Sequence, residues 1–241
     1  MTTEEDGLQG DARLAYRILC SADLFAGWPP GPLQRLAGEA SVGRYARGRH
    51  LSPANPRVRE VVFVGTGFID VSFTTRQGRA FLLGIFGPGH VLGILRLLPG
   101  EAAAYHYRVR EDSVVVRLPS ERLLAVLEGD PALWASVARM ALAQYRVAMH
   151  TIISRRVGDI SARVAGVLDN LATLHGEEGP GGIHLAVRVS QEDLAAMLST
   201  TRQTVNKELH LLALAGVIDV SYAAWVIRDL AALRRRMDYV W

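Results

Sequence analysis

Cysteine and lysine are almost absent from this chain of 241 residues. Cys20 is the only cysteine, which excludes an internal disulfide, a zinc site built on several thiolates and an iron–sulfur cluster held by cysteines of this chain. A single thiol fits a reducing, cytoplasmic setting best. Lys207 is the only lysine, so the positive charge comes almost entirely from arginine.

Long apolar segments are missing as well. No stretch offers the roughly 20 uninterrupted apolar residues of a membrane span, and the acidic N-terminal segment, MTTEEDGLQGDARL, lacks the apolar core of a signal peptide. The net charge of +3 is modest, and it permits a nucleic-acid partner without requiring one. With 49% hydrophobic residues, the chain is expected to be globular, without a membrane partner, and long enough for two domains.

The motifs of common enzyme sites do not occur in the sequence. A metal-dependent enzyme on a β-roll would need His-x-His and a downstream carboxylate, and there is no His-x-His. There is no Gly-x-Ser-x-Gly, and Gly87 and Gly89 in GPGHVLG lack the spacing of a dinucleotide site, so they are interpreted as turn residues. We expect no catalytic residue, metal or cofactor; the alternative from another class is a β-roll that binds a ligand or acts as a metal enzyme.

Two kinds of secondary structure are expected in the first half of the chain. Residues 11–40 are predicted to form two short helices separated by WPPG, with one apolar side marked by Leu24, Phe25, Leu33 and Leu36. Segments rich in Val, Ile and Phe follow, separated by turns that contain Gly or Pro, at 61–73, 79–86 and 107–118. Short strands of this kind predict a small antiparallel barrel or jelly roll, which we call the β-roll.

A single long helix is predicted from Pro131 to about Val157, because Pro is favoured at the first helical position and the residues from Ala132 to Val157 include no Gly or Pro. One stripe, which we call the seam, has the heptad spacing of a helix that packs against a copy of itself: Trp134, Ala138, Ala141, Tyr145, Ala148 and Ile152. A second stripe is expected to face the chain's own β-roll: Leu133, Val137, Met140 and Val147. Both stripes could be core within one chain, but two stripes on so long a helix favour two partners and hence a homodimer.

Two helix starts lie close together in VSQEDLAAMLSTTRQTVNKELHLLALAGVI. Ser190, with Asp193 three residues on, is a near match to the capping box of a first helix. After a short turn, Thr201 is a natural N-cap for a second helix that is predicted to run to about Ala215, with Gly216 just beyond its end. Two short helices joined by such a turn form a helix-turn-helix unit.

The second of these helices is predicted to have a contiguous polar face. At about 100° per residue, one arc holds Arg202, Gln203, Asn206, Lys207 and His210, and a separate arc holds Val205, Leu209 and Leu212. Arginine pairs with guanine, glutamine and asparagine pair with adenine, and lysine reaches guanine or phosphate. We therefore expect base contacts from Arg202, Gln203, Asn206 and Lys207, and phosphate contacts near the helix N-termini from Ser190, Gln191 and Thr201.

The flanking segments complete the C-terminal domain. Asp159 is expected to cap a helix that reaches about His175, and GEEGPGG at 176–182 is expected to be a loop. After Gly216, VIDVSYAAWVIRDL predicts two short strands around a tight turn near Tyr222 to Ala224, which would form a minimal wing. Because caps, turn, polar face and wing agree, they favour DNA binding over an inert pair of helices.

The order of these parts resembles the CRP/FNR superfamily of bacterial transcription regulators, over about residues 20 to 232 and most specifically in SQEDLAAMLSTTRQTVNKELHLLALAGVI. The resemblance implies an α+β fold with an N-terminal β-roll domain (1–130), a central dimerisation helix (131–157) and a C-terminal winged helix-turn-helix domain (158–241). Its implied partners are double-stranded DNA and a second copy of the chain, with RNA polymerase as a further candidate. It also implies that Arg202 contacts guanine, that Gln203 stands where many members have glutamate, and that Lys207 replaces a second basic residue.

The effector site is where the sequence departs from the family. Members that bind cyclic AMP have a Gly-Glu pair and then an Arg-Ser pair, whereas here Ile94 follows Gly93 and the second position falls near Ala104 and Tyr105. Unless Arg96 or Arg108 substitutes, a buried cyclic phosphate finds no counter-charge there. We expect an apolar or aromatic small effector, or none, in a pocket lined by Gly93, Ile94, Ala104, Tyr105, Ala148 and Met149. A cyclic-nucleotide-activated regulator is the alternative.

Overall fold

The computed structural model describes residues 9–51, 59–78, 80–98, 105–220 and 225–237. The chain divides into two compact units. The first consists of Met1–Gly78 and Leu83–Leu142, and the second consists of Arg79–Leu82 and Ala143–Trp241. Within the described ranges, no helix is long and apolar enough to cross a membrane.

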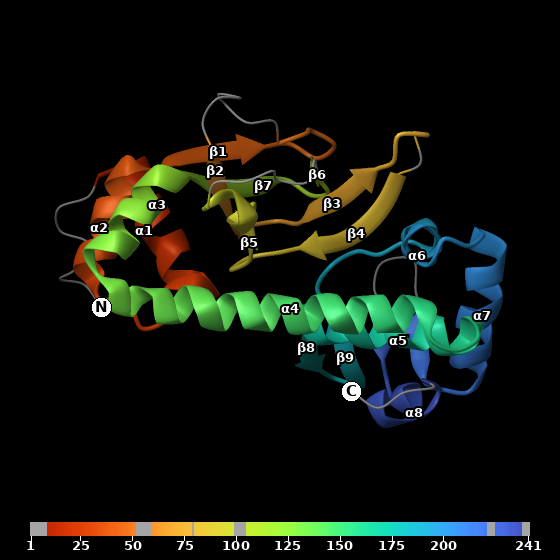
Figure 1. Ribbon diagram of the computed structural model, residues 1–241. Helices are drawn as coiled ribbons and strands as arrows, with labels where there is room; N and C mark the ends of the chain where they lie inside the picture. The colour runs from red at the N-terminus through yellow and green to blue at the C-terminus, as the bar shows by residue number, and fades with distance from the viewer. Residues whose placement is uncertain (1–8, 52–58, 79, 99–104, 221–224, 238–241) are drawn as a thin grey trace. The chain divides into compact units, whose positions relative to one another are not determined.

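Short helices open the first unit: α1 (Asp11–Ser21), the 3-10 helix η1 (Asp23–Phe25) and α2 (Pro30–Glu39). The prediction of separate helices in this segment is confirmed, but WPPG does not lie wholly between them: α2 begins at Pro30, because proline is favoured in the first turn of a helix, so only Trp28 and Pro29 precede it. The residues predicted to mark the apolar side are all buried: Leu24, Phe25, Leu33 and Leu36. Figure 1 shows α1 and α2 gathered with α3 (Ser120–Gly129) at one end of the β-roll.

The β-roll consists of two sheets. One sheet has the strand order β1-β7-β2-β5, formed by β1 (Ser41–Tyr45), β2 (Glu60–Thr66), β5 (Val91–Leu92) and β7 (Ser113–Pro119). The other has the order β4-β3-β6, formed by β3 (Ile69–Thr74), β4 (Ala80–Phe86) and β6 (Tyr105–Val109). The pairs β1–β7, β2–β7, β2–β5 and β3–β6 are antiparallel, which confirms the predicted antiparallel roll.

Alternation along β2 and β7 divides the apolar core of this unit into two clusters. Phe63 and Val116 belong to the cluster that also contains the buried side chains of α1, α2 and α3. Val64 and Val115 point the other way and pack with residues of β3 and β6, inside the roll. Successive side chains of a strand alternate between faces, so each of these two strands contributes to both clusters.

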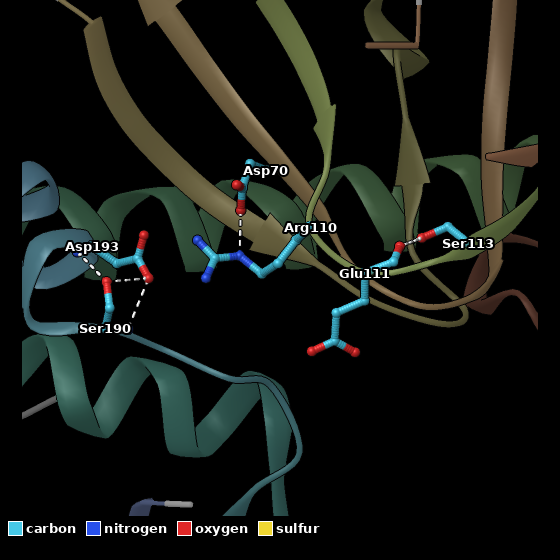
Figure 2. Close-up of polar contacts among 6 residues, drawn as sticks. All are labelled: Asp70, Arg110, Glu111, Ser113, Ser190 and Asp193. Atoms are coloured by element: carbon cyan, nitrogen blue, oxygen red, sulfur yellow. Dashed lines mark hydrogen bonds and ion pairs between the residues drawn. The ribbon is translucent and has the colours of Figure 1, made fainter. Parts of the chain in front are cut away.

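Two short contacts hold the turn between β6 and β7 (Figure 2). The Arg110 guanidinium donates through Nε to Asp70 Oδ1 on β3 at 2.6 Å, and both side chains are largely buried. The Ser113 hydroxyl donates to the carbonyl oxygen of Glu111 at 2.6 Å. One hydrogen bond therefore stabilises the turn internally, and an ion pair connects it to the neighbouring strand β3.

The long central helix is confirmed, with a tighter first turn than predicted. The 3-10 helix η3 (Pro131–Leu133) leads into α4 (Trp134–Arg156), and the Asp130 carboxylate accepts a hydrogen bond from the Ala132 amide at 3.2 Å to cap this turn. In the second predicted stripe, three residues are buried in the cluster shared with the helices, namely Leu133, Val137 and Met140. The fourth, Val147, is half-buried.

The second unit contains the C-terminal elements that the sequence predicts. Asp159 caps α5 (Ile160–His175) by accepting from the Ala162 amide at 2.9 Å. The helix-turn-helix unit consists of α6 (Gln191–Leu198) and α7 (Arg202–Leu214), followed by β10 (Ile218–Val220), β11 (Trp225–Ile227) and α8 (Leu230–Arg235). The two predicted wing strands are confirmed, and the predicted turn between them lies outside the described residues.

The prediction of a loop at 176–182 is wrong. Instead, β8 (Gly176–Gly179) and β9 (Gly182–Leu185) form an antiparallel hairpin, and β9 also pairs with β11, so the wing sheet has the order β10-β11-β9-β8. Gly182 has a φ of 137°, and a Cβ atom there would collide with the carbonyl oxygen of Ile227 on β11. The hairpin therefore depends on the absence of a side chain at this position.

Candidate nucleic-acid interface

The first helix of the helix-turn-helix unit starts with a complete capping box. The Asp193 amide donates to the Ser190 hydroxyl at 3.1 Å, and the Ser190 amide donates back to Asp193 Oδ2 at 2.8 Å (Figure 2). This reciprocal pair satisfies two amide groups that the helix itself leaves without acceptors. The near match seen in the sequence is therefore confirmed as a true cap of α6.

The turn between the two helices is tight and well bonded. Ser199 adopts the left-handed conformation with a φ of 51°, and the Thr200 amide donates to the carbonyl oxygen of Ala195 at 3.0 Å. Thr201 then caps α7, because its hydroxyl accepts from the Thr204 amide at 3.2 Å. These local bonds fix where α7 begins, as the sequence predicts.

The two predicted faces of α7 are both confirmed. The apolar arc is buried, with 0, 3 and 1% exposure for Val205, Leu209 and Leu212. The polar residues are all exposed: Arg202, Gln203, Asn206, Lys207 and His210. The helix is therefore anchored by one side and presents a polar surface of mixed donors and acceptors on the other.

A polar network connects the start of α6 to this surface. Arg202 Nη1 lies 2.8 Å from Glu192 Oε1, and Arg202 Nε donates to Gln191 Oε1 at 3.4 Å. The Gln191 amide group donates in turn to Asn206 Oδ1 at 2.9 Å. The structure thus brings together Gln191, Arg202 and Asn206, and it adds Glu192, which the sequence did not single out because the pair spans two helices.

The seam predicted on the central helix lies largely on the surface. Trp134 is half-buried, whereas the remaining members are exposed: Ala138, Ala141, Tyr145, Ala148 and Ile152. Tyr145 and Ile152 are 65% and 54% exposed, and the neighbouring Leu142 is 69% exposed. The helix therefore shows one apolar edge that the described part of this single chain leaves uncovered.

Polar side chains tie the second half of α4 to α5 and α8. His150 Nε2 lies 3.6 Å from Asp169 Oδ2, and Arg234 Nε donates to the other carboxylate oxygen of Asp169 at 2.7 Å. Burial lowers the pKa of His150 from its ordinary value of 6.5, and this effect outweighs the opposing pull of the Asp169 carboxylate. Asn170 adds a hydrogen bond to the Thr151 hydroxyl at 2.8 Å.

Arg155, close to the end of α4, is a second group whose ionisation is altered by burial. It donates through Nη1 to the carbonyl oxygen of Leu82 at 3.0 Å. Burial lowers the pKa of Arg155 to about 10, because the charged guanidinium has lost much of its hydration. The side chain remains charged at neutral pH.

The interior of the β-roll contains a buried ion pair. Arg117 Nη1 donates to Glu60 Oε2 at 2.9 Å, and Arg117 Nε donates to the Tyr45 hydroxyl at 3.0 Å. Tyr107 packs against the same interior cluster, and burial raises its pKa, while the Arg96 guanidinium acts in the opposite direction. The roll therefore holds charge in its interior, and Arg117 is already paired with a carboxylate.

The residues predicted to line an effector pocket are distributed over both units. Gly93 has a φ of 75° and precedes the 3-10 helix η2 (Ile94–Arg96). Ile94 packs against the cluster shared with the helices, and Tyr105 packs against the interior of the roll. Ala148 and Met149 lie on α4 in the second unit, and Ala104 lies outside the described residues. The pocket stays a prediction.

Across the described ranges, no three His, Cys, Asp or Glu side chains are grouped in a way that could hold a metal ion. His90 makes a hydrogen-bond contact through Nδ1 with the carbonyl oxygen of Gly87 at 3.1 Å, three residues earlier in the chain. His184 contacts the carbonyl oxygen of Pro180 at 2.9 Å in the same way. Both histidines thus have local structural contacts.

Two protein-family models match this chain. The model described as a Crp-like helix-turn-helix domain matches residues 162–236, which include α6 and α7. The model described as a cyclic nucleotide-binding domain matches residues 42–130, which include nearly all of the β-roll. The combination defines a class of transcription regulators in which a domain of the cyclic nucleotide-binding type precedes a helix-turn-helix domain.

Similar proteins extend this match over most of the chain. A CRP-like cAMP-activated global transcriptional regulator of Mycobacterium tuberculosis is 24% identical over 220 residues, which cover 91% of this chain and 98% of that protein. A cyclic AMP receptor protein of Thermus thermophilus is 26% identical, over 87% of this chain and 94% of that protein. The structure of FixK2 from Bradyrhizobium japonicum has the same fold, with a TM-score of 0.71 at 20% identity, covering 84% of this chain and 99% of that one.

The chain belongs to the CRP/FNR superfamily of bacterial transcription regulators, and it is a DNA-binding regulator of that type. The resemblance identified in the sequence is therefore confirmed.

Proposed function

We propose that this regulator binds a palindromic DNA site as a homodimer. The observation that carries the proposal is the exposed polar face of α7, held in place by a capped start and a buried apolar arc. Two such helices, related by a two-fold axis, would enter successive major grooves about 34 Å apart. Base contacts are assigned to Arg202, Gln203, Asn206 and Lys207, and phosphate contacts to Ser190, Gln191 and Thr201.

The dimer contact is assigned to the seam of α4. Exposed apolar side chains at heptad spacing are typical of a helix that packs against a copy of itself, and Tyr145 and Ile152 are both more than half exposed. In this arrangement residues 131–157 dimerise and residues 158–241 bind DNA, and residues 1–130 form the domain that would bind an effector if the protein has one. RNA polymerase is a further candidate partner of this regulator. We place its action in the cytoplasm, and we assign it no catalytic step.

The experiment starts with the DNA that the protein selects from a genomic library. Binding of the wild type and of Arg202→Ala is then measured on the selected site and on random DNA. We expect Arg202→Ala to cost about 1–3 kcal/mol on the selected site and to relax the preference at one base pair. Thr201→Ala, which removes the assigned phosphate contact together with the N-cap of α7, should weaken binding to both DNAs more evenly. Equal losses of Arg202→Ala on both DNAs would refute the assignment of Arg202.

The effector is proposed to be apolar or aromatic, or to be absent altogether. Ile94 stands where cyclic-AMP-binding members have glutamate, and it packs into an apolar cluster. Arg117, a buried arginine of the roll, is paired with Glu60, so a phosphate would have to break that pair to use it. Screening a metabolite extract for a change in DNA binding would test this part of the proposal.

A cyclic nucleotide is the second candidate effector. It is favoured by the family model that matches residues 42–130 and by the names of two similar proteins, one cAMP-activated and one a cyclic AMP receptor. Titration calorimetry with cyclic AMP distinguishes the two candidates. Tight stoichiometric binding that also strengthens DNA binding would establish the second and reject the first.

A further inference from the structure

Gln191 joins two of the residues that are assigned to bases. Its side-chain oxygen, Oε1, accepts a hydrogen bond of 3.4 Å from Nε of Arg202, and its side-chain nitrogen, Nε2, donates one of 2.9 Å to Oδ1 of Asn206. Arg202 and Asn206 are four residues apart and are therefore neighbours on one face of α7. Both ends of the Gln191 amide are thus engaged by α7, although Gln191 itself lies in the first turn of α6.

The chemistry of these groups fixes the orientation of each amide. A guanidinium only donates, so Gln191 faces Arg202 with its oxygen and Asn206 with its nitrogen. Asn206 must meet that nitrogen with its own oxygen, and its nitrogen, Nδ2, is left to donate outward. The reversed orientation of Asn206 would set two donors against each other. The exposed face of α7 therefore has a defined donor at Asn206.

We propose that Gln191 is a positioning residue: it fixes the side-chain amide of Asn206 so that the base facing Asn206 must present an acceptor in the major groove. Guanine, adenine and thymine each present one there, whereas cytosine presents only the N4 donor. This inference rests on the base contact proposed for Asn206. It predicts that cytosine is the base excluded at that position.

The phosphate contact proposed for Gln191 is compatible with this role. The nitrogen of a side-chain amide carries two hydrogens, so one can reach a phosphate while the other is bonded to Asn206. Phosphate oxygens accept, and they therefore require the same orientation of Gln191 as Arg202 does. Bound DNA also displaces water that competes for these groups, so their hydrogen bonds are stronger in the complex than in the unbound protein.

The cost of a mismatch falls on the wrong site. A thymine that faces Asn206 is bound with the hydrogen bond to Gln191 intact. Cytosine either leaves its N4 donor opposite Nδ2 or forces Asn206 to reverse, and a reversal breaks the hydrogen bond to Gln191. We expect the site that presents cytosine to bind about three- to tenfold more weakly than the same site with thymine.

Gln191→Glu tests the proposal, because it keeps the shape of the side chain and removes its donor. A carboxylate only accepts, so Asn206 should turn Nδ2 toward it and present its oxygen to DNA. The base pair concerned is the one at which Asn206→Ala abolishes the preference among the four base pairs. At this pair the wild type should prefer thymine to cytosine on one strand, and Gln191→Glu should prefer cytosine to thymine on the same strand. Gln191→Met, which holds neither orientation, should prefer neither base.

A double variant separates this effect from the added negative charge. The charge of Gln191→Glu weakens binding to every site by repelling phosphates, so the readout is the ratio of affinities for the thymine and cytosine sites. In the Asn206→Ala background, Gln191→Glu should leave this ratio unchanged. Unchanged melting temperatures would show that the variants are folded.

The outcomes distinguish the role of Gln191 from that of Asn206. If Gln191→Glu leaves the ratio unchanged or only brings it to one, or if it reverses the ratio equally without Asn206, the role of Gln191 is rejected. If Asn206→Ala changes the preference at no base pair, the proposed base contact of Asn206 itself fails.

Discussion

Arg163 Nη2 donates a hydrogen bond of 2.6 Å to the carbonyl oxygen of Leu198, the last residue of α6. The same guanidinium donates through Nε to the carbonyl oxygen of Arg155 at 2.8 Å, near the end of α4. Carbonyl groups in the last turn of a helix lack partners within the helix, so one side chain of α5 caps two other helices. Arg163 thereby links the end of the central helix to the helix-turn-helix unit.

Replacement of Arg163 by methionine should therefore destabilise the second unit. We expect a loss of about 1–3 kcal/mol in the free energy of unfolding, because two partly buried carbonyl groups lose charged donors while the aliphatic part of the side chain is kept. Urea denaturation of the full-length protein measures this loss. Arg156→Met is the control, since Arg156 is exposed at the end of α4; a comparable loss in the control would contradict the capping role.

His150 predicts a dependence of stability on pH. Because its pKa is lowered in the folded protein, the unfolded chain binds more protons in the range below about pH 6.5. The stability contributed by neutral His150 is thus fully present above that pH and is lost as the pH falls toward the lowered folded pKa. The urea midpoint of the wild type should decrease from pH 7.5 to pH 5.5, and it should decrease less in His150→Gln. Equal decreases of the urea midpoint in the wild type and in His150→Gln would show that groups other than His150 cause the loss of stability.

The seam on α4 can be tested with one substitution at two positions of the same helix. Ala141 belongs to the seam, and Ala143, two residues on, lies on the opposite side; both are exposed. Ala141→Glu should convert the proposed dimer to a monomer, because it places like charges face to face across the proposed contact, whereas Ala143→Glu should sediment as the wild type does. Sedimentation velocity distinguishes the two states. A wild type that sediments as a monomer would refute the assignment of this surface.

The β8–β9 hairpin makes Gly182 sensitive to substitution. Gly182→Ala should destabilise the second unit by about 1–3 kcal/mol, because its φ of 137° is unfavourable for any residue with a side chain. Urea denaturation of Gly182→Ala beside Glu178→Ala, an exposed position on β8, measures this cost. An unaltered midpoint for Gly182→Ala would mean that the hairpin does not pair with β11 as described.

Helix starts were the most predictable part of the fold, since their determinants are local. Ser190 with Asp193, and Thr201 alone, each satisfy amide groups within three residues along the chain, so spacing is sufficient to find them. The two faces of α7 follow from helical periodicity for the same reason. The long central helix was predictable because no Gly or Pro interrupts its sequence, although its first turn is a 3-10 helix.

The remaining features depend on residues that are distant in the sequence. Glu177 and Glu178 form a strand through backbone pairing with β9, and their exposed polar side chains leave no alternation to detect. The Glu192–Arg202 ion pair depends on how α6 crosses α7, and no spacing rule within a single helix relates two residues ten positions apart. The predicted effector pocket likewise combines residues that are distant in the sequence, such as Gly93 and Ala148, so spacing along the chain does not define its lining.

Lys207 combines two properties: it is the only lysine of the chain, and it is exposed on the polar face of α7. A reagent that acylates primary amines therefore has one side-chain target in the whole sequence, beside the terminal amine. Bound DNA would shield this target. The extent of acylation at a single position, followed by mass spectrometry, would then report how much of the protein is engaged on DNA, without any engineered label.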